Sequence, residues 1–453
     1  MVHHNFHLEE LERLASLYKQ NPKFSEETYK QNQVKRGLRD ANGAGVVTGL
    51  TDISDVIAKK MVDGVLTPCA GELYYRGIDV RDMINSYDDT NCRGFEEATY
   101  LLLFNHLPNK AELDDFMKLL AYYRKIPKNF VRDVIMKSPN KDIMNSLSRC
   151  ILALYSYDNK ALDNSLDNVL RQCLLLIAVL PMFAVYSYSA HMHYNENKSF
   201  FIHRPKPELS TAENVLYMLR EDSKFTPLEA KVLDIAFMLH AEHGGGNNST
   251  FTTHVVTSAG TDTYSTITAA LCSLKGPKHG GANIKVMDMF ADIKKHVSDW
   301  NNEEKLRDYL SKILDGQAFD NAGLIYGMGH AVYSISDPRA QVFKGFVEKL
   351  AKAKGRMKEF NLYSKVEEIS QRLICEKRRI MKGVSANVDF YSGFVYEMLG
   401  LPTELYTPMF AVARMSGWSA HRLEELLNSG KIIRPAYVST NGRKPYVKIE
   451  ERK

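Results

Sequence analysis

Most of the chain after residue 90 repeats hydrophobic side chains with the 3.6-residue period of an amphipathic helix. Prolines and short polar stretches separate the periodic segments, and no alternating strand pattern lies between them. This order is typical of a bundle of helices rather than of a repeated strand-helix-strand unit. The pattern predicts helices over residues 95–105, 110–124, 142–155 and 165–189.

Two further helices are indicated by their ends. Thr226 and Glu229 have the spacing of a capping box, with proline at the first helical position, and three glycines at 244–246 provide a strong stop signal. Residues 263–274 are rich in serine, threonine and alanine, so that their backbone can approach its neighbours closely. We therefore expect a second, buried central helix at 263–274.

The first ninety residues have a different pattern. Leucines and charges at helical spacing predict helices over residues 8–20 and 25–36, with Pro22 between them. Short β-rich pieces follow at 45–48 and 72–75, where glycine and proline interrupt the chain. We expect a helical N-terminal extension followed by a small sheet or hairpin.

Composition narrows the class of protein. With 453 residues, 44% hydrophobic and 25% charged, the chain is long enough for two or three domains and has the composition of an ordinary globular protein. Its 59 lysines and arginines exceed its 54 aspartates and glutamates by five, without a block of like charge, so no nucleic-acid partner is indicated. A small anionic substrate is compatible with this charge balance.

The cysteines and the apolar segments indicate the cellular location of the protein. Six cysteines lie far apart without a C-x-x-C pair, which argues against a disulfide framework or zinc cluster and predicts reduced, mostly buried thiols. The N-terminus lacks a signal-peptide pattern. The longest apolar run, residues 173–185, contains Pro181 and is shorter than the ~20 residues of a membrane helix, which favours a kinked core helix. We interpret the chain as a cytoplasmic protein without a membrane partner.

Histidines beside glycines mark the candidate chemistry, because each such segment places an ionisable ring where a ligand can reach the backbone. A histidine between glycines on a rigid turn suits a hydrogen-bond donor that points at a carbonyl group. The histidine segments are residues 240–247, 276–283 and 327–339, and a further polar segment is 387–393.

Other residues suggest a metal or an anion. His240 and His243 are three residues apart, but no nearby cysteine and no H-E-x-x-H pattern supports a metal site there. Arg339, Arg414 and Arg434 could be turn or surface cations. Several bidentate guanidinium groups are, however, what a small polycarboxylate needs, and three arginines match such a ligand.

Taken in order, these segments resemble the citrate synthase family. The resemblance is carried by G-P-x-H-G-G-A-N around His279, G-x-G-H and D-P-R-A after residue 326, N-V-D-F-Y-S-G around Asp389 and I-I-R-P around Arg434. The histidine pair before the glycine-rich stop and the segment 414–421 are similar as well. The resemblance extends from about residue 45 to residue 437.

The resemblance implies an all-α, two-domain helical fold with a small β-hairpin near the N-terminus, a homodimer, and an active site in the cleft between the domains. It implies neither a metal nor a redox cofactor, since a coenzyme A thioester is a substrate. On this basis we predict an N-terminal extension at 1–44, a large domain from 45–275 and 386–437, a small domain at 276–385, and a tail at 438–453.

The implied reaction is that of citrate synthase in the tricarboxylic acid cycle. Acetyl-CoA condenses with oxaloacetate, and citryl-CoA is hydrolysed to citrate and CoA. His279 and Asp389 resemble the pair that enolises acetyl-CoA, and His330 resembles the residue that polarises the oxaloacetate ketone. The resemblance also implies four ligands of the substrate carboxylates, the last of them contributed by the partner subunit: His243, Arg339, Arg414 and Arg434.

Three alternatives remain at this point. A 2-methylcitrate synthase would use propionyl-CoA, and one methylene in an apolar pocket is worth only ~1–3 kcal/mol of discrimination, although we favour acetyl-CoA. A catalytically silent helical regulatory or interaction protein would not need the intact set of His279, His330 and Asp389. A metal-dependent hydrolase would use His240 and His243. The sequence does not identify the residues that bind the CoA phosphates.

Overall fold

The structure is a computed structural model that describes residues 2–40, 44–87, 92–329, 332–380, 383–428 and 430–452. Its contacts divide the chain into two compact units. The first consists of Met1–Leu50 with Arg434–Lys453, and the second is Thr51–Ile433. The further division of the second unit into a large and a small domain stays a prediction.

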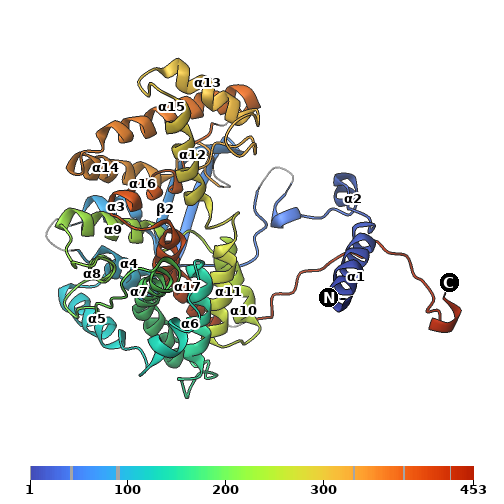
Figure 1. Ribbon diagram of the computed structural model, residues 1–453, viewed down its shortest axis with the longest axis horizontal. Helices are drawn as coiled ribbons and strands as arrows, with labels where there is room; N and C mark the ends of the chain where they lie inside the picture. The colour runs from blue at the N-terminus through green and yellow to red at the C-terminus, as the bar shows by residue number, and fades with distance from the viewer. Residues whose placement is uncertain are drawn as a thin grey trace. The chain divides into compact units, whose positions relative to one another are not determined.

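The described residues are mostly helical, with one small sheet (Figure 1), as the sequence predicts. In the first unit the elements are α1 (Val2–Lys19), α2 (Glu26–Gln31) and the 3₁₀ helices η1 (Arg36–Leu38) and η4 (Ile449–Glu451). In the second unit they are β1 (Ser54–Val62), β2 (Val65–Tyr75), β3 (Ile78–Asp79), α3 (Val80–Asn85), α4 (Gly94–Phe104), α5 (Lys110–Tyr123), the π-helix η2 (Val131–Ile135), α6 (Ile143–Tyr155), α7 (Leu166–Glu196), α8 (Thr211–Leu219), α9 (Pro227–His240), α10 (Asn248–Ser258), α11 (Thr263–Lys275), α12 (Ala282–His296), α13 (Glu303–Leu314), α14 (Pro338–Ala353), α15 (Met357–Arg378), α16 (Asp389–Met398), the 3₁₀ helix η3 (Thr403–Leu405) and α17 (Tyr406–Leu427).

The predicted helix ends are confirmed where a local signal marks them. The Thr226 hydroxyl accepts from the backbone N–H of Glu229, and the Glu229 carboxylate accepts from that of Thr226, so the capping box at the start of α9 is complete. Helix α9 ends at His240, just before the glycines, and α11 ends at Lys275, just before Gly276. The helices predicted at 95–105, 110–124, 142–155 and 165–189 correspond to α4 to α7.

The predicted sheet near the N-terminus is confirmed, and its hairpin is longer than expected. β1 and β2 form an antiparallel pair joined by Asp63 and Gly64. Both turn residues have positive φ, as in the type I′ turn that matches the twist of a hairpin. Pro68 lies in the central strand β2 opposite Lys59, beside a register shift, where a missing N–H is tolerated.

The strand prediction at 45–48 is wrong. This segment makes only an isolated bridge between Gly45 and Arg39, and the first long strand begins at Ser54. A β-rich composition over four residues does not make a strand without a paired neighbour, and β1 finds its neighbour in the residues just after the turn.

Helix α7 is the core helix of the second unit. It is long and apolar enough by length and composition to cross a membrane, but 83% of its apolar window is buried inside the fold. It packs against α5, α6, α8 and α17, and it contains Pro181.

All six cysteines are free. Only Cys150 and Cys173 are buried, so the expectation of mostly buried thiols is wrong.

Helices α12 to α16 gather on one side of the second unit, above α9 (Figure 1). α14 packs on α9, α3 and β2, and α16 packs on α12 and α14. The candidate catalytic segments lie at the ends of these helices, where they meet α9 and α17.

Candidate active site

Two loops from distant parts of the sequence run side by side. The Gly329 N–H donates to Ser385 O at 2.7 Å, and the Asn387 N–H donates to Gly327 O at 2.9 Å. The Asn387 side chain donates to Gly329 O at 3.0 Å. Gly329, which precedes His330, is therefore hydrogen-bonded to Asn387, which lies two residues before Asp389. His330 itself lies outside the described residues, so its assigned role stays a prediction.

Gly327 is required where these loops meet. It has φ +78°, and a Cβ atom there would lie 2.9 Å from side-chain atoms of Phe390 and Val286. A side chain would therefore force the loop away from the start of α16. The sequence interpretation of this glycine as part of a turn is confirmed.

Asp389 is the first residue of α16, and Asn387 accepts a hydrogen bond from its backbone N–H at 3.0 Å. No group within the described ranges donates a hydrogen bond to the Asp389 carboxylate. Burial raises the pKa of Asp389 to about 6, with a further rise from Asp337, against the opposing effect of the Arg339 and Arg414 cations. The carboxylate is thus a stronger base than an ordinary aspartate while still ionised near neutral pH.

Arg339 lowers the pKa of this carboxylate through its charge, and it already has a partner. Its Nε and Nη2 donate to the Asp337 carboxylate at 3.1 and 2.7 Å, and both side chains are almost fully buried. Although burial opposes it, the Asp337 carboxylate raises the pKa of Arg339. Asp337 also caps α14. The pair holds one edge of the guanidinium group in a fixed direction.

Arg414 is the most informative residue of the site. The alternative interpretation of Arg414 as an exposed helix cation is wrong, because the side chain is fully buried on α17, while its predicted role as a substrate ligand stays a prediction. Nε donates to His240 O at 2.7 Å, and the guanidinium group lies 4.9 Å from the centre of the Phe410 ring. Nη1 and Nη2 have no hydrogen-bond partner in the described part of the chain. A buried guanidinium group with two unused nitrogens is suited to an anionic ligand.

Gly417 allows α17 to approach the end of α9 this closely. A Cβ atom at position 417 would lie 2.2 Å from Glu242 Oε2 and 2.5 Å from Ala241 O. Arg414 and Gly417 are three residues apart and so face the same side of the helix. Any larger residue at 417 would push α17 away from residues 240–242.

His279 lies in the turn between α11 and α12 and is oriented by a serine. Its Nε2 is 3.0 Å from Ser249 Oγ, and this hydroxyl also accepts from Trp418 Nε1 at 3.1 Å and contacts Asn247 Oδ1 at 3.0 Å. Burial lowers the pKa of His279 to about 4, with Arg414 adding to the effect. The imidazole is therefore neutral at physiological pH and can serve as a hydrogen-bond donor rather than as a cation.

His243 is buried at the end of α9 and lies 3.2 Å, through Nε2, from the Tyr333 hydroxyl. The Tyr333 hydroxyl also donates to Glu72 O in β2 at 3.4 Å. Gly71 is required beside it, because a Cβ atom there would lie 2.5 Å from the tyrosine ring. The small sheet therefore positions the Tyr333 ring against His243.

The described residues do not support a metal site at His240 and His243. Both ring nitrogens of His240 lack a hydrogen-bond partner there, and the ring lies against Phe410 at 4.4 Å between centroids. No group of three metal-ligating side chains in the described ranges includes either histidine. Burial lowers the pKa of His240 well below its usual value, with Arg339 and Arg414 adding to the effect.

Arg434 is exposed and belongs to the first compact unit. Its role as a ligand from the partner subunit stays a prediction.

Two of the other sequence candidates are affected by the same cation, since Arg414 lowers the pKa of both His279 and Asp389. Sequence reasoning missed the residues that orient them, namely Ser249, Trp418 and Tyr333. Trp418 offered a signal, because it is one of only two tryptophans and lies in the segment 414–421.

A carboxylate of raised basicity, a neutral imidazole and a buried guanidinium with unused nitrogens define an acid–base site for a small anionic substrate in a helical enzyme. Comparison with known proteins gives the family. Residues 41–436 match the family described as "Citrate synthase, C-terminal domain". The chain belongs to the citrate synthase family and is therefore an enzyme, an acyltransferase.

Three similar proteins illustrate the family. A citrate synthase from Synechocystis sp. is 35% identical over 84% of this chain and 88% of its own. A 2-methylcitrate synthase from Corynebacterium glutamicum is 32% identical over 93% of this chain and 99% of its own. A citrate synthase structure from Thermoplasma acidophilum, a ternary complex with carboxymethyl coenzyme A and oxaloacetate, has a TM-score of 0.74 and 29% identity over 92% of this chain and 99% of its own.

Proposed function

We propose that this enzyme condenses acetyl-CoA with oxaloacetate and hydrolyses citryl-CoA to citrate and CoA. The observation that carries the proposal is the buried Arg414 guanidinium with two unpartnered nitrogens, whose charge acts on an Asp389 carboxylate with a pKa raised to about 6. The first group suits a dicarboxylate substrate, and the second suits the removal of a weakly acidic proton.

The first step is enolisation of the thioester. An α-proton of a thioester is very weakly acidic, so a carboxylate base needs a donor that stabilises the developing enol oxygen. Asp389 takes the methyl proton, and neutral His279 donates to the thioester carbonyl. The Ser249 hydroxyl can turn its single proton from Asn247 to His279 Nε2, which places the ring proton on Nδ1 and frees that N–H for the substrate.

The second step forms the carbon–carbon bond. The enol attacks the ketone carbon of oxaloacetate, whose oxygen gains negative charge and is stabilised by His330. Arg339, Arg414 and His243 bind the oxaloacetate carboxylates, and Arg434 reaches them from the partner subunit of a homodimer. A closed site excludes water until condensation is complete, and water then hydrolyses the thioester. The chemistry uses no metal or redox cofactor.

Turnover with two thioesters tests the reaction. We expect free CoA thiol to appear from acetyl-CoA only when oxaloacetate is present. A preference for propionyl-CoA of tenfold or more in kcat/KM, about 1.4 kcal/mol of differential transition-state binding, would instead make the enzyme a 2-methylcitrate synthase. Relatives of both names match the chain, so this choice needs the measurement.

The variant Asp389→Asn tests the assigned base. Because an amide cannot accept the methyl proton, we expect kcat to fall by several powers of ten, while oxaloacetate binding and the unfolding temperature stay close to those of the unaltered enzyme. Near-normal kcat in this variant would remove Asp389 from the mechanism. His279→Ala should fail similarly, since the enol oxygen loses its donor.

Mixed dimers test the contribution of Arg434 in trans. An Asp389→Asn chain paired with an Arg434→Ala chain has one doubly altered site and one intact site. Random pairing makes half of the dimers mixed, so activity should recover to about one quarter of the normal rate. Mixed dimers that are no more active than the parents would place Arg434 within its own chain's site.

A further inference from the structure

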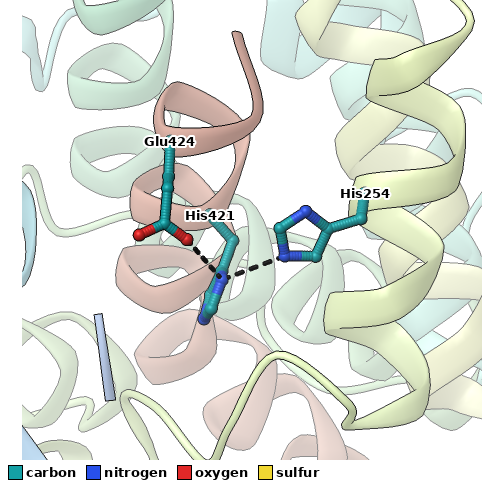
Figure 2. Close-up of side chains that lie close together, drawn as sticks. All are labelled: His254, His421 and Glu424. Carbon is teal, nitrogen blue, oxygen red and sulfur yellow. Dashed lines mark hydrogen bonds and ion pairs between the residues drawn. The ribbon is translucent and has the colours of Figure 1, made fainter. Parts of the chain in front are cut away.

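A second histidine cluster lies on α17 and α10 and includes none of the proposed reacting groups. Figure 2 shows His421 and Glu424 on α17 pointing toward His254 on α10. His254 Nε2 and His421 Nδ1 are 3.1 Å apart, and Glu424 Oε2 is 3.7 Å from His421 Nδ1. One ligand atom from each of the three residues lies within 4.8 Å of the others. The proposed mechanism does not use this cluster.

The outer nitrogen of each ring faces a carboxylate. His421 Nε2 is 3.0 Å from Glu242 Oε1, and His254 Nδ1 is 2.7 Å from Glu425 Oε2. Glu242 Oε1 also accepts from the Ser54 hydroxyl and the Gly244 N–H, so this oxygen acts as an acceptor toward His421 Nε2 as well. Each ring therefore donates its outer N–H to a carboxylate.

This assignment uses both protons that two neutral imidazoles carry. The inner nitrogens, His421 Nδ1 and His254 Nε2, then face each other as two lone pairs at 3.1 Å. Two lone pairs at this distance repel unless a proton or a metal cation lies between them. The cluster thus needs a positive centre.

Glu424 distinguishes the two kinds of positive centre. Its Oε1 accepts from the Asp52 N–H at 2.8 Å, but its Oε2 is buried and has no hydrogen-bond partner in the described ranges. A proton shared by the two rings would give this oxygen an ion pair with His421 at 3.7 Å but no hydrogen bond. A metal ion would take it as a third ligand, together with the two ring nitrogens.

We propose that His254 Nε2, His421 Nδ1 and Glu424 Oε2 form a binding site for Zn²⁺. Ligand atoms on a tetrahedral zinc ion are about 3.3 Å apart, given bonds of roughly 2.0–2.1 Å, and the printed separations of 3.1 and 3.7 Å are close to this value. Two imidazoles and one carboxylate are a typical zinc ligand set that leaves a fourth position for water.

The surroundings complete the site. Glu242 and Glu425 accept from the outer N–H of each ring, which is the carboxylate–histidine–metal arrangement that fixes ring orientation. The ion would join α10, α17 and, through Glu424, the backbone at Asp52. Such an ion would hold these segments together.

Cobalt binding to the full-length enzyme tests the site. After removal of bound metal with a chelator, Co²⁺ serves as the probe, because tetrahedral Co²⁺ has visible absorption bands that octahedral Co²⁺ nearly lacks. We expect one Co²⁺ per chain with these bands, displacement of Co²⁺ by Zn²⁺, and a higher unfolding temperature with either ion.

Two variants and one control locate the ion. His254→Gln and Glu424→Gln each remove one ligand while keeping size and hydrogen-bonding capacity, and each should weaken Co²⁺ binding at least tenfold and abolish the bands. His106→Gln is the control, because His106 is an exposed histidine 3.7 Å from Glu112 and outside the cluster. Absence of tetrahedral bands, or equal affinity in His254→Gln and His106→Gln, would overturn the proposal and leave a shared proton in the cluster.

Discussion

Two buried arginines on the same helix, eight residues apart, differ in one respect. Arg414 and Arg422 are both fully buried on α17, and burial lowers the pKa of both. Arg414 uses only Nε within the described protein, on His240 O. Arg422 uses all three nitrogens, and its acceptors are Asn164 Oδ1, Thr257 Oγ1, Thr261 O, Thr263 Oγ1 and Thr266 Oγ1.

The difference between the two arginines distinguishes a structural role from a proposed role in ligand binding. Taking a guanidinium group out of water is costly unless its N–H groups find acceptors. At Arg422 the protein supplies the acceptors, so the group holds α17 against α11. At Arg414 the acceptors are incomplete without an anion. Unmet donors, rather than burial, therefore distinguish Arg414, the proposed substrate ligand, from Arg422.

Arg414→Leu should produce the largest effect. Removing two charge-assisted contacts to a substrate carboxylate should lower kcat/KM for oxaloacetate by about 10³-fold or more. The unfolding temperature without substrate should fall much less than in Arg422→Leu, because only the Nε hydrogen bond to His240 O is lost and no acceptor depends on Nη1 or Nη2. Steady-state kinetics and thermal unfolding measure the two quantities. A stable variant with normal kcat/KM would contradict the assignment of Arg414 as a substrate ligand.

Arg422→Leu should have the opposite profile. Its loss leaves several buried acceptors without donors, so we expect the free energy of unfolding to fall by about 3 kcal/mol. Folded protein at low temperature should keep nearly normal KM for oxaloacetate. Denaturant unfolding monitored by circular dichroism provides the value. A change below about 0.5 kcal/mol would show that these hydrogen bonds contribute little.

The pH dependence of activity should reflect the charges beside Asp389. The base must be ionised, and its pKa is raised to about 6, so kcat/KM should fall as pH drops through 6 and reach about one tenth near pH 5. His279, with a pKa of about 4, stays neutral over this range. Arg414 opposes the rise in the Asp389 pKa. The acid limb of Arg414→Leu should therefore move to higher pH, whereas that of Arg422→Leu should not move.

Ser249→Ala should have the smallest effect. Ser249 contacts His279 at 3.0 Å and is proposed to act through it, so its loss should lower kcat severalfold while leaving KM for oxaloacetate nearly unchanged. Ser249→Thr keeps the hydroxyl and should restore much of the rate. If KM rises and kcat is unchanged, Ser249 shapes the substrate pocket rather than orienting His279.

Helices were predicted well because their signals are local. The capping box at Thr226 and the glycines after His243 define α9 without any tertiary contact. β1 was missed because its half-exposed sequence contains Lys59 and Lys60, and its pairing with β2 is what makes it a strand.

Motifs pointed to the candidate reacting residues, whose roles stay predictions, but not to the residues that contact them. Asp389 and His279 lie in distinctive glycine- and asparagine-containing segments. Ser249 and Tyr333 are a common hydroxyl and a common aromatic, and their importance comes from contacts with residues 30 and 90 positions away. His254 is distinguished only by α17 lying beside α10, which no local pattern encodes.

Gly417 has a consequence for how this protein can evolve. It lies between Arg414 and His421 on one face of α17, against Glu242 and Ala241. A replacement there displaces the helix that carries both Arg414, the proposed substrate ligand, and a ligand of the proposed zinc site. A library randomised at 417 and selected for growth should return glycine alone, since every other codon alters both sites in one step. The two proposed sites therefore depend on the same glycine and cannot change independently at this position, although their chemistry differs.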